Sequence, residues 1–204
     1  MAGDFFNITR RSDDDLVTAF RDSGRSALYD KAGASLVLVC IYRGREPAAR
    51  ALVSAGHRVG LHEATALGDM DRLATALDAA PWSVDLLSPD GWTALHLAAF
   101  FGRARMAHAL LAGGAAADVW SRSFERNLPI HAAAASRSED MAILEALIPA
   151  TADIDTIQEE GYSPLLIAAS VGKRAWVERL IQAGADPGRR TKDGKGLADI
   201  LPVG

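Results

Sequence analysis

The chain has 204 residues, of which 49% are hydrophobic and 24% are charged. This balance is typical of a soluble chain that buries a sizeable core, and it excludes full disorder and a collagen-like fibre. The net charge of -4 argues against nucleic acid as a partner, because phosphate binding usually needs a strongly basic face.

No segment has the properties of a secretory signal or a membrane span. The longest apolar run, over residues 35–42, is far shorter than the roughly 20 residues that cross a bilayer. The single cysteine, Cys40, excludes a disulfide framework within the chain and favours a reducing compartment. We therefore expect a cytoplasmic protein with no membrane partner.

Residues 1–29 are expected to form an N-terminal helical cap. Ser12 and the three aspartates after it have the pattern of a helix start. A helix beginning there would carry Leu16, Val17 and Phe20, which can cover the open end of the next structural unit.

Self-similar segments follow along the rest of the chain. Residues 91–102, GWTALHLAAFFG, align with residues 161–172, GYSPLLIAASVG, which lie 70 residues further on. A related segment, NLPIHAAA, occupies residues 127–134 between them. Each segment is followed by a second apolar stretch, so the spacing indicates a row of stacked repeats.

Capping residues predict what each repeat builds. Ser35, Thr93 and Ser163 can cap the first amides of a helix, and Pro129 and Pro164 suit the first helical position. A glycine that can adopt a left-handed backbone then ends this short helix: Gly44, Gly68, Gly102 and Gly172. The next stretch has apolar residues at the three-to-four spacing of a second helix. The unit is therefore helix, turn, helix and loop.

These residues resemble the ankyrin repeat family, whose pattern includes Gly-x-Thr-Pro-Leu-His-x-Ala-Ala and, after a second helix, Gly-Ala-Asp. The resemblance is fullest over 88–118 and 158–187, and it covers about 30–200. It implies an all-α ankyrin-repeat solenoid with hairpin-like loops and a truncated C-terminal cap at 188–204. About five repeats are expected, at 30–56, 57–87, 88–120, 121–157 and 158–187.

Two repeats depart from the family pattern. The connection from Gly56 to Leu61 is too short for a hairpin loop, so the second repeat should lack one. The fourth repeat has Arg126 and Arg137 where glycines are expected. It also has about two extra residues around Ser138, which predicts a longer turn between its helices.

Nothing in the sequence suggests catalysis or metal binding. The resemblance gives His96 and His131 a structural role, in which the imidazole bonds to loop backbone. No two histidines have the i, i+4 spacing of a helical metal site. Cys40 falls at a packed position of a first helix, where a thiol is normally inert. We expect no enzymatic activity, no cofactor and no metal.

The resemblance also implies a partner-binding surface. Family members bind through loop tips and the exposed ends of the first helices, and six of the equivalent residues here are aromatic, although only 6% of the chain is. The acidic members suggest a partner with a basic rim. Any one ring can instead pack on a neighbouring loop. The candidate residues are Trp92, Phe100, Phe101, Trp120, Phe124, Glu125, Asn127, Glu159, Glu160 and Tyr162.

The expected function is a non-catalytic protein–protein interaction module that binds a macromolecular partner through its concave loop and first-helix face. One alternative is an accessory subunit of an enzyme, with a small-molecule pocket near residues 57–64. Another is a structural protein that self-associates through the same aromatic residues. Between these oligomeric states, a monomer is favoured.

Overall fold

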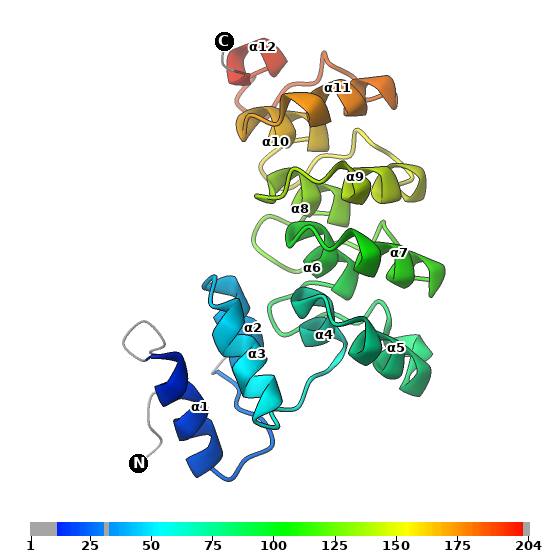
Figure 1. Cartoon of the computed structure of the whole chain (residues 1–204). Helices are drawn as coiled ribbons and strands as arrows, with labels where there is room; N and C mark the ends of the chain where they lie inside the picture. Colours follow the sequence, from blue (N-terminus) through cyan, green and yellow to red (C-terminus); the bar gives the residue numbers. More distant parts are fainter. Residues whose placement is uncertain (1–11, 31–32, 202–204) are drawn as a thin grey trace.

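The computed structural model describes residues 12–30 and 33–201. Figure 1 shows an elongated stack of helix pairs, with α1 and α12 at opposite ends of the stack. The described residues form helices and no strand, apart from an isolated bridge between Tyr29 and Ser35. The predicted all-α solenoid is thus confirmed. The parts of the expected caps at 1–11 and 202–204 lie outside the described residues.

The helix α1 (Asp13–Asp22) begins where the sequence predicts. The Ser12 hydroxyl accepts a hydrogen bond from the Asp15 N–H, and the Asp15 carboxylate accepts one from the Ser12 N–H. This reciprocal cap satisfies two amide groups that would otherwise lack partners. Leu16, Val17 and Phe20 are buried against the next helix pair.

The first helix pair consists of α2 (Leu36–Tyr42) and α3 (Glu46–Ser54). Together with α1 it forms its own apolar core, which Ala66, Leu67 and Leu97 of the following repeats complete. In Figure 1, α2 and α3 run steeply, whereas the helices that follow lie across the view. The first pair is therefore tilted against the rest of the stack.

Four further pairs form a regular column. Their first helices pack on one another, and their second helices form the other side of the column. One continuous core runs through these pairs from Leu61 to Ala185. The elements are α4 (Leu61–Leu67), α5 (Met70–Ala79), η2 (Pro81–Ser83), α6 (Ala94–Phe100), α7 (Ala104–Ala112), α8 (Pro129–Ala135), α9 (Met141–Leu147), η3 (Ile148–Ala150), α10 (Pro164–Ser170), α11 (Arg174–Gln182) and α12 (Leu197–Ile200).

The turns between paired helices follow the predicted chemistry. All four expected turn glycines have positive φ angles, from +64° at Gly102 to +77° at Gly172. The fourth repeat has the longer turn that was expected, since α8 ends at Ala135 and α9 begins only at Met141. Arg126 adopts a φ of +42°, so an arginine occupies a backbone conformation that favours glycine.

Basic side chains connect two of these turns to the preceding repeat. The Arg103 Nε–H donates to the Ala66 carbonyl at 3.1 Å, and the Lys173 ammonium donates to the Ala133 carbonyl at 3.1 Å. Both acceptors lie in the last turn of a first helix, where carbonyls lack partners within the helix. A cation there also complements the negative end of the helix dipole.

The second repeat lacks a loop hairpin, as predicted. Residues 57–60 run directly from α3 to α4. The His57 Nε2 accepts a hydrogen bond from the Leu28 N–H at 3.1 Å, and the Arg58 N–H donates to the Ser26 carbonyl at 2.7 Å. The loop of the first repeat therefore reaches that of the third, where a Cβ on Gly33 would lie 3.3 Å from Pro89.

Candidate protein-binding surface

Three hairpin loops form a connected row beside the first helices. We call residues 88–92, 121–127 and 158–162 the three fingers. The Arg122 N–H donates to the Gly91 carbonyl at 2.8 Å, and the Glu159 N–H donates to the Glu125 carbonyl at 2.9 Å. Gly91 has a φ of +86°, and a Cβ there would lie 2.9 Å from the Arg122 backbone. The fingers are thus packed too closely to move independently.

Two buried histidines connect the first helices to the fingers and loops. His96 Nδ1 lies 2.8 Å from the Thr93 hydroxyl, and its Nε2–H donates to the Asn127 carbonyl at 3.0 Å. The His131 Nε2–H donates to the Thr156 carbonyl at 2.8 Å. Burial lowers the pKa of both imidazoles to about 4. Both rings are neutral near pH 7, and the structural role predicted for them is confirmed.

A groove of about 770 Å³ runs between the three fingers and the first helices. Six of the ten candidate residues line it: Trp92, Phe100, Glu125, Asn127, Glu160 and Tyr162. The other lining residues are Tyr42, Asp90, Ser123, Ala132, Ala135, Gln158, Ile167, Ser170 and Val171. The groove therefore joins residues from four repeats into one hollow surface.

The aromatic wall of this groove is an edge-to-face cluster. The Trp92 and Phe100 rings are perpendicular, with centroids 5.3 Å apart, and Phe100 contacts Phe101 at the same centroid distance. Tyr42 of α2 extends the cluster, since its ring lies 5.6 Å from that of Phe101. Trp92, Phe100 and Phe101 are half-buried, because each ring covers part of its neighbour. Their role is both structural and surface-forming.

The charged residues that line the groove are all acidic: Asp90, Glu125 and Glu160. Asp90 accepts hydrogen bonds from the hydroxyls of Tyr42 and Ser88. Glu125 and Glu160 form no ion pair with any residue in 12–30 or 33–201. The groove thus carries negative charge, and no cationic side chain in the described part of the chain lines it.

Asn127 is buried, unlike the exposed residues among the candidates. Only 6% of the residue is exposed, because its N–H donates to the Ser121 hydroxyl and its carbonyl accepts from His96. These backbone bonds turn the residue inward at the base of its finger. Its side chain nevertheless lines the groove, and its buried Oδ1 has no hydrogen-bond partner among the described residues.

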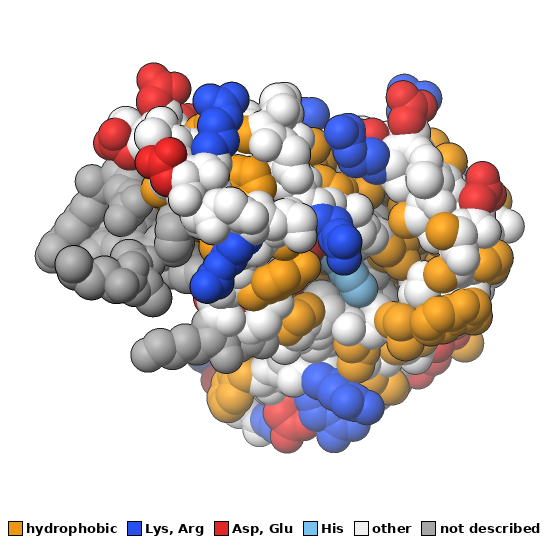
Figure 2. Space-filling view, turned by 90° about the horizontal axis from the view of Figure 1, so that it is seen from below, with side chains coloured by type: hydrophobic (Ala, Val, Ile, Leu, Met, Phe, Trp, Pro, Cys, Tyr) orange, Lys and Arg blue, Asp and Glu red, His pale blue; other side chains and the backbone are white. Residues whose placement is uncertain are grey.

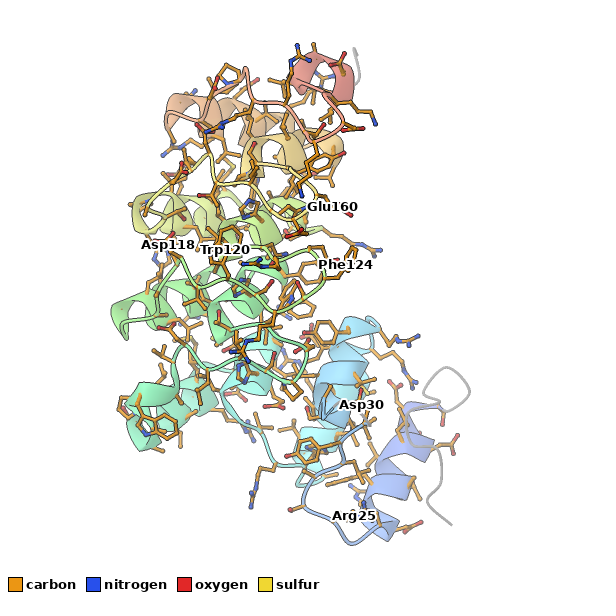
Figure 3. The ribbon with its side chains drawn as sticks, turned by 180° about the vertical axis from the view of Figure 1, so that it is seen from behind. Arg25, Asp30, Asp118, Trp120, Phe124 and Glu160 are labelled. Atoms are coloured by element: carbon orange, nitrogen blue, oxygen red, sulfur yellow. The ribbon has the colours of Figure 1, made fainter. Side chains whose placement is uncertain are left out.

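A different hollow, of about 620 Å³, lies beside the fingers. Its lining includes Trp120, Phe124 and Glu159. Phe124 is 82% exposed and Trp120 is 38% exposed. The Arg126 guanidinium lies 5.9 Å from the Trp120 ring centroid. Figure 3 shows Trp120 and Phe124 on the loop between α7 and α8, with Glu160 on the next finger.

Phe101 faces a third hollow of about 630 Å³, which it shares with Tyr42 and Phe100 of the aromatic wall. Three arginines line this hollow: Arg43, Arg103 and Arg137. Only Arg103 has a partner among the described acids, because its guanidinium lies 2.8 Å from the Glu46 carboxylate. The ten candidates are therefore divided among three adjoining surfaces of different charge.

Sequence reasoning missed several lining residues. Tyr42 stands two positions before Gly44, as Phe100 stands before Gly102 and Ser170 before Gly172. Applying the same register to every repeat would have found Tyr42 and Ser170. Two exposed apolar residues outside the candidate set, Trp82 and Leu86, are 75% and 48% exposed but line none of the three hollows. Figure 2 looks along the stack from its N-terminal end, and apolar side chains gather there on the side of α5.

The remaining reactive groups have structural surroundings. Cys40 is fully buried, and burial raises the pKa of its thiol to about 11. Within residues 12–30 and 33–201, no group of three His, Cys, Asp or Glu side chains could hold a metal ion. No helix in this part of the chain is long and apolar enough to span a bilayer. Near residues 57–64, His57 is buried and both ring nitrogens bond to backbone.

Family models identify this architecture. A model of three ankyrin repeats matches residues 61–156, and a model of a single ankyrin repeat matches residues 160–192. Together these matches cover more than half of the chain, which therefore belongs to the ankyrin repeat family. Both matches lie within the regular column that follows the tilted α2–α3 pair.

Several curated proteins are similar to about half of the chain. The chain is 39% identical over 97 residues to neurogenic locus notch homolog protein 1 of Xenopus laevis, covering 47% of this chain and 4% of that protein. It is 40% identical over 96 residues to neurogenic locus notch homolog protein 4 of Homo sapiens, covering 47% and 5%. It is 37% identical over 97 residues to neurogenic locus Notch protein of Drosophila melanogaster, covering 47% and 3%. The chain thus spans a small part of each curated relative.

Proposed function

We propose that this chain is a non-catalytic module that binds a segment of a partner protein in the groove between the three fingers and the first helices. The observation that carries the proposal is the groove itself, which is formed by four repeats and contains six of the ten residues that the family register selects. Membership of a repeat family supports a binding role, because repeats present extended concave surfaces.

The groove has the physical properties of a protein-binding site. Backbone hydrogen bonds hold neighbouring fingers together, so little conformational entropy is lost when a partner binds. Trp92, Phe100 and Tyr162 are half-buried and still line the groove. Burying more of such rings contributes about 25 cal/mol per Å² of apolar surface. Aromatic anchors of this kind often dominate the free energy of association.

Site-specific photocrosslinking tests the proposal without knowledge of the partner. A photoreactive amino acid replaces Ser170, which lies at the end of α10 and lines the groove. In a matched control it replaces Glu178, which is exposed on α11 of the same repeat. Each purified variant is irradiated in an extract of the cells that produce the chain, and the products are identified by mass spectrometry.

We expect the Ser170 variant to capture one protein that the Glu178 variant does not. Trp92→Ala in the Ser170 background should reduce that product severalfold, while circular dichroism shows that the helices remain folded. Equal capture from both positions would contradict the proposal. A product with twice the mass of the chain would show self-association through the groove instead.

A further inference from the structure

We propose that the groove selects an extended peptide segment carrying an arginine side chain, which it places between Glu125 and Glu160. This inference rests on the proposed function, because it names the chemistry of the partner segment at the same groove. Three observations support it independently: the sign of the charge in the groove, an unpartnered amide oxygen, and the aromatic wall.

The charge of the groove favours a cation. Its charged lining residues are Asp90, Glu125 and Glu160, with no lysine or arginine among them. Glu125 and Glu160 lie on neighbouring fingers, which are joined by the hydrogen bond from Glu159 N–H to the Glu125 carbonyl. Because both carboxylates line the same groove, a cation that enters it is attracted to both. The groove therefore favours a positively charged side chain.

The Asn127 side chain favours a peptide over a free cation as the ligand. The buried Oδ1 of its side-chain amide has no hydrogen-bond partner within 12–30 and 33–201, although the residue is 94% buried and lines the groove. An unpaired buried amide oxygen costs free energy, so a ligand that supplies its partner gains affinity. An amide has one acceptor and two donors. After rotation about its last torsion, the Asn127 Oδ1 can therefore accept a hydrogen bond from a backbone N–H of an extended chain.

The aromatic wall favours arginine over lysine. Trp92 and Tyr162 line the groove that holds the two glutamates. A guanidinium is planar, stacks on aromatic faces and forms paired hydrogen bonds with carboxylates, whereas an ammonium is a compact and strongly hydrated charge. Stacking and ion pairing can thus act on the same arginine group.

The neighbouring hollow restricts where such a side chain binds. It adjoins the groove through Tyr42 and Phe100, but its lining includes Arg43 and Arg137, which have no acidic partner among the described residues. A cation would be repelled from that hollow. The arginine is therefore directed to the acidic side of the aromatic wall.

Peptide pools with one fixed residue test the inference. Seven-residue peptides, acetylated and amidated at their ends, carry random residues around a central arginine, citrulline, lysine or glutamate. Citrulline has nearly the shape of arginine but no charge. Each pool is attached to a surface, and binding of the full chain is measured as a function of its concentration and of salt.

We expect the arginine pool to bind at least tenfold more tightly than the citrulline pool and more tightly than the lysine pool, with the advantage falling as salt rises. The double variant Glu125→Gln, Glu160→Gln should lose most of this advantage. Glu159→Gln is the matched control, because Glu159 adjoins Glu160 but lines the other hollow, and it should keep the preference. Asn127→Ala should weaken binding of all pools alike. Its thermal unfolding is measured in parallel to verify folding.

Equal binding of the arginine and citrulline pools would overturn the inference. So would an arginine preference that persists in the double glutamine variant. If Ser170 crosslinking still captures a partner in either case, the groove remains the binding site and only its cation selectivity is wrong. If the arginine preference is found but crosslinking captures nothing specific, the peptide chemistry holds and the proposed cellular function fails.

Discussion

The regular column from α4 to α11 and the tilted unit of α1–α3 are built from the same kinds of helix but are held together differently. In the column, one core passes through every repeat, and buried histidines connect the first helices to loop backbone. The N-terminal unit has a second core, to which Leu67 and Leu97 of the column contribute, and it begins with a capped helix. The matched family models cover the column. The column, whose sequence matches the repeat pattern, is therefore also the part of the chain that shares one continuous core.

The junction between these regions depends on polar contacts as well as apolar ones. Glu46 of α3 accepts from both Arg50 and Arg103, and these two arginines also donate to carbonyls at the end of α4. Tyr42 of α2 reaches Asp90 on the first of the three fingers. The missing hairpin of the second repeat allows this direct contact. The groove consequently extends across the junction.

The largest expected effect is on stability, and it compares the two cores. Leu110→Ala in the column and Leu52→Ala in the N-terminal unit each remove a fully buried side chain. Each should lower the free energy of unfolding by about 2 to 5 kcal/mol through a cavity. Hydrogen exchange should separate them, because Leu52→Ala should expose amides of α1–α3 while α6–α11 stay protected. Equal loss of protection along the whole chain would show a single cooperative unit.

Acid should destabilise the column through its histidines. The pKa of His96 and of His131 is about 4 in the folded chain, below the usual value near 6.5 of an unfolded histidine. The unfolded state therefore binds more protons between these values, so stability is full above pH 6.5 and is lost as the pH falls toward 4. At about pH 4.5 the loss should be roughly 2 to 3 kcal/mol per histidine.

Urea unfolding of the wild type and of the variant His96→Gln, His131→Gln at about pH 7 and 4.5 measures this loss. The variant is less stable at neutral pH, but its stability should depend much less on pH. An equally steep pH dependence in both proteins would assign the acid sensitivity to other groups.

The polar junction should contribute a smaller amount. Arg103→Ala removes hydrogen bonds to Ala66 and Glu46, and it should lower the free energy of unfolding by about 1 to 2 kcal/mol. Arg72→Ala is the control, because its ion pair with Asp69 lies within a single exposed turn and should contribute less than about 0.5 kcal/mol. Chemical denaturation of both variants gives the comparison, and similar losses would mean that the junction is held by its apolar contacts alone.

The smallest expected effect is a gain in stability within the column. Arg126→Gly should relieve the positive φ angle of the fourth repeat and raise the unfolding free energy by about 0.5 to 1 kcal/mol. The gain is limited because the variant also loses the contact of Arg126 with Trp120. Thermal unfolding measures the change. A lower melting temperature would indicate that this contact outweighs the backbone strain.

Local chemistry explains why the sequence predicts the fold well. Ser163, Pro164 and Gly172 act within one or two helical turns, so their effect on the start and end of α10 can be deduced from neighbouring residues. The short connection after Gly56 and the arginine at position 126 were also recognisable as departures from a repeated pattern.

The groove is harder to predict from local sequence, because it depends on contacts between residues that are far apart along the chain. Tyr42 and Asp90 are 48 positions apart, and their contact depends on the missing hairpin of the repeat between them. The inward position of Asn127 depends on bonds to His96 and Ser121 that a linear pattern does not reveal. The place of a residue within the repeat pattern predicts whether it faces the fingers. How deeply that residue is buried depends on how the rings and loops pack.

Hydrogen exchange of the full chain with and without the partner captured from Ser170 tests most directly whether the groove is the binding site. We predict protection of the three fingers and of the end of α2 at Tyr42, while α5, α7, α9 and α11 remain unchanged. Protection confined to the exposed apolar residues Trp82 and Leu86 beside α5, with unchanged exchange in the fingers, would contradict this prediction.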